Sequence, residues 1–82
     1  MNKEERKQKE AELAACERFA EEAYDAMYEA HSSSDATGRY SDAKEAFYDA
    51  IRAARKLGLK GEVRRLEARL EHVKSVFRSQ FS

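Results

Sequence analysis

Apolar residues recur along the first third of the chain at the spacing of one helix face. They follow one another at steps of three and four positions, at Leu13, Cys16, Ala20, Ala23, Met27 and Ala30. Such a stripe predicts an amphipathic helix, here over residues 3–31. No apolar side chain lies between positions 3 and 10. Without such an anchor, we expect residues 1–10 to fray.

A small-polar cluster over residues 32–38 follows this stripe and ends at Gly38. Serine, threonine and aspartate side chains compete with a helix for backbone hydrogen bonds, so the cluster predicts a loop. A second helix is expected over residues 41–57, with Ser41 as its N-cap. Its apolar stripe consists of Ala43, Phe47, Ala50, Ala54 and Leu57. Gly58 suits a left-handed C-terminal ending of the Schellman type, with Leu59 packing back on the helix.

A third helix is predicted over residues 62–80, after a tight turn at residues 59–61. Its stripe consists of Val63, Leu66, Leu70, Val73 and Phe77. Because the turn is short, this helix should run antiparallel to the second. The 82 residues are enough for one domain with a thin core. The sequence therefore predicts a single all-α domain, an antiparallel three-helix bundle over residues 1–82.

One stretch of the second helix resembles a known family. Gly38, Tyr40, Ala43, Phe47 and Ala50 match the second-helix signature of tetratricopeptide repeats in spacing and type. Only one such hairpin fits in the chain, which argues against a repeat array with a superhelical groove. In length and architecture the chain is similar to microtubule-interacting-and-transport type domains. That resemblance implies a three-helix bundle whose first two helices form a tetratricopeptide-like hairpin and whose grooves bind short helices of partner proteins.

Charge is balanced overall but divided unevenly along the chain. The 16 basic and 16 acidic residues cancel, yet residues 10–35 carry eight acids and one base. Residues 52–82 carry nine bases and three acids. We therefore expect the first helix to attract the last, within one chain or between subunits. The alternative is an anionic partner, nucleic acid or another polyanion, bound by Arg65, Arg69 and Lys74.

No residue constellation predicts catalysis, a cofactor or a metal. The single cysteine, Cys16, lies on the apolar stripe, and His31 and His72 lack the spacing of helical metal sites. We therefore expect no enzyme, no cofactor and no small-molecule substrate. The charged N-terminus lacks the apolar segment of a secretory signal, and no apolar run is long enough to span a membrane. A cytoplasmic protein without membrane contact is the expectation.

The predicted function is a non-enzymatic protein-interaction or self-associating module. Thin alanine-rich stripes bury little area, which favours a homodimer or a protein partner. The aromatic residues that edge the stripes are the predicted partner contacts: Tyr24, Tyr28, Tyr48 and Phe77. Nucleic acid is disfavoured because three glutamates interrupt the basic face and the sequence pI is only 6.7.

Overall fold

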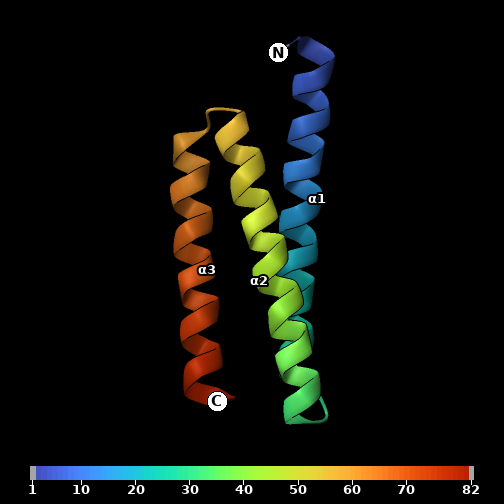
Figure 1. Ribbon diagram of the computed structural model, residues 1–82, viewed down its shortest axis with the longest axis vertical. Helices are drawn as coiled ribbons and strands as arrows, with labels where there is room; N and C mark the ends of the chain where they lie inside the picture. The colour runs from blue at the N-terminus through green and yellow to red at the C-terminus, as the bar shows by residue number, and fades with distance from the viewer. Residues whose placement is uncertain (1, 82) are drawn as a thin grey trace.

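Three α-helices follow one another in the computed structural model, which describes residues 2–81. They are α1 (Lys3–Tyr28), α2 (Ser33–Lys56) and α3 (Lys60–Gln80). α2 packs against both of its neighbours and runs antiparallel to each, so that α1 and α3 are parallel (Figure 1). The N-terminal turns of α1 extend past the α2–α3 turn, and the molecule measures 46 × 19 × 13 Å. The predicted all-α three-helix fold is confirmed.

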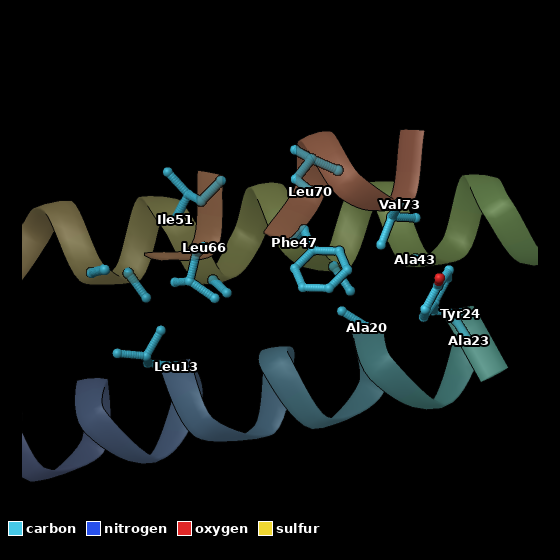
Figure 2. Close-up of a cluster of buried hydrophobic side chains, with 14 of the residues drawn as sticks. Leu13, Ala20, Ala23, Tyr24, Ala43, Phe47, Ile51, Leu66, Leu70 and Val73 are labelled. Carbon is cyan, nitrogen blue, oxygen red and sulfur yellow. The ribbon is translucent and has the colours of Figure 1, made fainter. Parts of the chain in front are cut away.

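Small side chains allow the helices to approach one another around one large ring. Phe47 of α2 is fully buried, and its ring points into the space between α1 and α2 (Figure 2). Ala20 of α1 and Ala43 and Ala50 of α2 are also fully buried. Leu66 and Val73 close the core from α3. The alanines leave room for the larger side chains of the facing helix, which is how the predicted stripes pack.

The predicted loop over residues 32–38 is wrong, because α2 begins at Ser33. Ser32, rather than Ser41, is the N-cap, and its Oγ accepts a hydrogen bond from the Asp35 N–H at 3.1 Å. Ala36 is buried, so this extra turn gains packing energy that outweighs its polar composition. α1 correspondingly ends at Tyr28, before the predicted position 31. The connection between the two helices is residues 29–32.

The Schellman ending of α2 is confirmed, although the turn that follows is shorter than predicted. The Leu59 N–H donates to the Ala54 carbonyl and the Gly58 N–H to the Arg55 carbonyl, both at 3.0 Å. Gly58 has φ of 71°, a conformation that glycine adopts without strain. α3 then begins at Lys60, so that Gly61 lies in its first turn rather than in the connection.

The first turns of α1 are helical although they touch little. The Asn2 side chain accepts a hydrogen bond from the Glu5 N–H at 2.8 Å, which caps this end. Residues 3–8 are exposed, and Leu13 is the first buried side chain. Fraying over residues 1–10 stays a prediction, and residue 1 itself lies outside the described residues.

Candidate interaction surface

The four predicted contact aromatics differ in how much of each side chain reaches solvent. Tyr24 is only 7% exposed and belongs to the core, whereas Tyr28 is 48% and Tyr48 41% exposed. Phe77 is half-buried and stacks on Tyr40 of α2, with ring centroids 4.0 Å apart and planes 2° from parallel. Tyr28 and Tyr48 are therefore accessible to a partner, while Tyr24 and Phe77 mainly hold the bundle together.

Aromatic rings join all three helices at the end of the bundle where α3 ends. Phe77 stacks on Phe81 at 6.0 Å, and Phe81 meets Tyr28 edge to face at 5.9 Å. Tyr28 in turn meets Tyr24 edge to face at 5.4 Å. Such pairs add to the stabilisation that area burial gives. This cluster ties α3 to α1 at a point where α2 does not separate them.

The hydroxyls of Tyr24 and Tyr28 lie 3.0 Å apart and share a hydrogen bond. Burial of the Tyr24 phenol, assisted by this bond, raises its pKa to about 12. Ionisation would place a charge in a desolvated position beside a second phenol, which disfavours the phenolate. Tyr24 is therefore neutral over the physiological range.

Two arginines of α3 pair with acidic residues of α1. Arg65 Nη1 and Nη2 donate to the two carboxylate oxygens of Glu17 at 2.6 and 2.8 Å. Arg69 binds Glu21 in the same two-point manner. The Arg65 hydrogen bond is the main cause that lowers the pKa of Glu17, against the opposing effect of burial. The expected attraction between the first and last helices is confirmed within one chain.

Two of the three residues of the predicted polyanion site are thus occupied by carboxylates. The third, Lys74, donates from Nζ to the Tyr48 hydroxyl at 3.1 Å, which raises the pKa of the amine. Its Nζ also lies 5.5 Å from the Tyr48 ring centroid. A polyanion would have to displace Glu17 and Glu21 before it could reach the two guanidinium groups, and those carboxylates would repel it.

The most exposed large apolar side chain is one that the sequence did not single out. Phe19 is 55% exposed on the flank of α1 that lies away from α3's ion pairs. It lines a shallow groove of about 420 Å³ between α1 and α2. We call this groove the acidic groove. It is lined by Ala15, Cys16, Phe19, Asp42, Glu45, Ala46 and Asp49. The acidic groove thus has an apolar α1 wall and a carboxylate-rich α2 wall.

A second hollow with the opposite charge lies at the α2–α3 turn. It has a volume of about 360 Å³. We call it the basic hollow. It is lined by Arg55, Gly58, Leu59, Lys60, Val63 and Arg64. Leu59 and Val63 are partly buried and supply the apolar floor, while the charged residues surround it.

A helical-phase argument could have found Phe19 from the sequence. Consecutive residues of an α-helix point 100° apart, and Ala20 lies at the centre of the α1 stripe. Phe19 must therefore lie at the edge of that stripe, where a ring as large as phenylalanine is only half covered. What the sequence lacked was the small size of the facing side chain, Ala46, which leaves the groove open.

The described residues contain no group of histidine, cysteine or acidic side chains arranged to hold a metal ion. Within the same range, none of the helices has the length and hydropathy needed to cross a bilayer. Comparisons with protein-family models, with curated proteins and with solved structures each found no match.

Proposed function

We propose that this chain is a small non-enzymatic helical module that binds protein, either a partner or a further copy of itself. The proposal rests mainly on one observation: Phe19 is exposed in a groove that has an apolar α1 wall. About half of the Phe19 side chain stays in water in the monomer, and a second molecule that covers it gains free energy from burying that apolar surface. Buried aromatic anchors in pockets contribute most of the binding energy of protein interfaces.

The exposed tyrosines extend this surface to other sides of the bundle. Tyr48 lies over the α2–α3 groove beside Ile51 and Leu70, and Tyr28 is exposed at the far end of α1. Tyrosine offers a large rigid contact area with a polar tip, which suits a surface that must remain soluble when it is unoccupied. Phe19 therefore leads the proposed contact set, followed by Tyr48 and Tyr28.

The resemblance to tetratricopeptide hairpins and to microtubule-interacting-and-transport type domains supports the same proposal. Ala43, Phe47 and Ala50, which carry it, are the residues at which α2 packs in the core. Domains of this build bind partner helices in the grooves between their own helices. We propose an amphipathic helix, or the helical surface of a second copy, as the ligand class.

Photo-crosslinking tests the proposal directly. A photoreactive amino acid at position 19 should give discrete adducts when the purified protein is irradiated alone or in a cell extract, and peptide mapping should place each adduct on a helix. The matched control carries the same group at position 18, which is exposed, adjoins Phe19 in the chain and does not line the groove. Equal labelling from both positions, or no discrete adduct from position 19, would refute the proposal.

A further inference from the structure

Two hollows of this molecule are lined by charges of opposite sign, carboxylates in the acidic groove and cations in the basic hollow. Asp42 and Glu45 of the acidic groove make no ion pair with any described residue. Lys60 and Arg64 of the basic hollow likewise have no carboxylate partner within residues 2–81. The groove and the hollow therefore carry opposite unpaired charges, each set beside apolar side chains.

We propose that the acidic groove of one copy binds the basic hollow of a second copy. In this contact Phe19 packs on Leu59 and Val63 of the other copy, while Asp42 and Glu45 face its Lys60 and Arg64. The inference rests on the proposed function and deepens it by naming the partner. Complementary charges around a small apolar centre give register and a fast encounter rather than high affinity.

A second copy fits better than an unrelated basic helix, because it matches both surfaces at once. The chain has zero net charge, so an excess of one sign in the groove must be balanced elsewhere on the molecule. Part of that balance lies in the basic hollow, which a separate basic partner would leave unmatched. Each copy carries both sites, so the contact is heterologous: the groove of one copy meets the hollow of the next.

Two charge-reversal variants test the contact, because each reverses the charges of one of the two sites. One variant carries Asp42→Lys and Glu45→Lys, and the other carries Lys60→Glu and Arg64→Glu. All four side chains are exposed and unpaired, so neither variant loses a core contact or an internal ion pair. Circular dichroism and melting curves verify that both remain folded. A control variant, Glu4→Lys with Glu29→Lys, makes the same charge change as Asp42→Lys with Glu45→Lys, but outside both sites.

Sedimentation equilibrium at low salt measures the association. The unmodified protein should associate, and added salt should weaken the association. Each double variant alone should associate at least about tenfold more weakly, because like charges then face each other. An equimolar mixture of the two should recover association, since both contacts between them again join opposite charges. The control should associate like the unmodified protein, and Phe19→Ser should weaken association at unchanged charge.

The results that overturn this inference differ from those that overturn the proposed function. A protein that stays monomeric up to about 1 mM, a range in which even weak complexes form, refutes the second copy as partner. A mixture that associates no better than its components also refutes it. If position 19 then crosslinks to a helix of another protein, the interaction function stands without self-association. If it crosslinks to nothing, both proposals fall.

Discussion

Arg69 on α3 and Glu21 on α1 form a two-point ion pair, with N–O distances of 2.8 and 2.7 Å. One turn earlier, Arg65 and Glu17 repeat this arrangement at the same sequence separation of 48 residues. Two pairs with one offset define the register of α1 against α3, which run parallel to each other. A shift of either helix by one residue would break both pairs.

Replacing Arg69 by alanine should lower the free energy of unfolding by about 1 to 2 kcal/mol. The change removes two charge-assisted hydrogen bonds and a guanidinium that lies 5.0 Å from the centroid of the Tyr24 ring. Partial exposure of the pair keeps the expected loss modest. Urea unfolding measures it.

The matched control is Arg52→Ala, whose ion pair with Asp49 lies on the surface of a single helix. Such pairs contribute little, so its stability should change by less than about 0.5 kcal/mol. Equal losses in the two variants would contradict a register role for Arg69.

Protonation of Glu17 in acid should lower the free energy of unfolding. Its pKa in the folded chain is lowered below 4.5, chiefly by the Arg65 hydrogen bond. The unfolded chain therefore binds the proton more readily, and the contribution of Glu17 is full above pH 4.5 and declines as pH falls through its folded-state pKa. In Glu17→Gln, the free energy of unfolding should fall less steeply below that pH.

Urea unfolding at a series of pH values tests this expectation. Glu29→Gln is the control, because it removes one carboxylate that lies outside both surfaces and makes no ion pair with any described residue. The same loss of slope in both variants would show that general charge, rather than the Arg65 contact, sets the acid behaviour.

Phe77 should behave as a core residue rather than as a partner contact. Phe77→Ala removes the stack on Tyr40 and the contact with Phe81, and should cost about 2 to 3 kcal/mol of stability. Tyr48→Ala, at an exposed position, should cost less than about 1 kcal/mol. Thermal unfolding compares the stability of the two variants. A larger loss for Tyr48→Ala would contradict the assignment of Phe77 to the core and of Tyr48 to the exposed surface.

Tyr24 should link stability to pH at the alkaline end. Its folded-state pKa is raised to about 12 from an ordinary value of 10.0, first by burial and then by the Tyr28 hydrogen bond. The stabilisation is therefore complete below pH 10 and is lost as pH rises towards 12. Ultraviolet titration should show one late-titrating tyrosine, absent from Tyr24→Phe. In Tyr28→Phe it should titrate earlier but still late, because burial persists.

Periodicity predicted most of this architecture, because the steps of three and four residues identify the buried face of each helix directly. Ala20, Phe47 and Leu66 are all buried as their stripes require. Charge asymmetry predicted the pairing of the first helix with the last, since residues 10–35 carry eight acids and residues 52–82 carry nine bases. Two ion pairs join these segments, Arg65–Glu17 and Arg69–Glu21. The apolar stripes and the charge asymmetry can both be read from the local sequence, and the folded structure buries the stripes and pairs the charges as expected.

The helix boundaries and the exposed groove depend on tertiary contacts that the local sequence does not contain. Residues 33–40 have a loop-like composition, yet Ala36 is buried and Tyr40 stacks on Phe77, 37 positions away. These contacts favour the helix over the turn that serine and glycine would otherwise form. The exposure of Phe19 likewise depends on which residue of α2 faces it.

Alanine substitutions at Gly38, which ends the predicted loop, and at Gly58, which follows the second helix, should change the free energy of unfolding in opposite directions. Gly58 has φ of 71°, so Gly58→Ala forces a side chain into the left-handed region and should cost about 1 kcal/mol. Gly38 lies inside α2, and a Cβ added there meets nothing within 4 Å. Gly38→Ala should therefore raise the free energy of unfolding by about 0.5 to 1 kcal/mol, because alanine favours helix. Chemical denaturation measures both, and a destabilised Gly38→Ala would mean that residues 33–40 form the loop that their composition predicts rather than the first turns of α2.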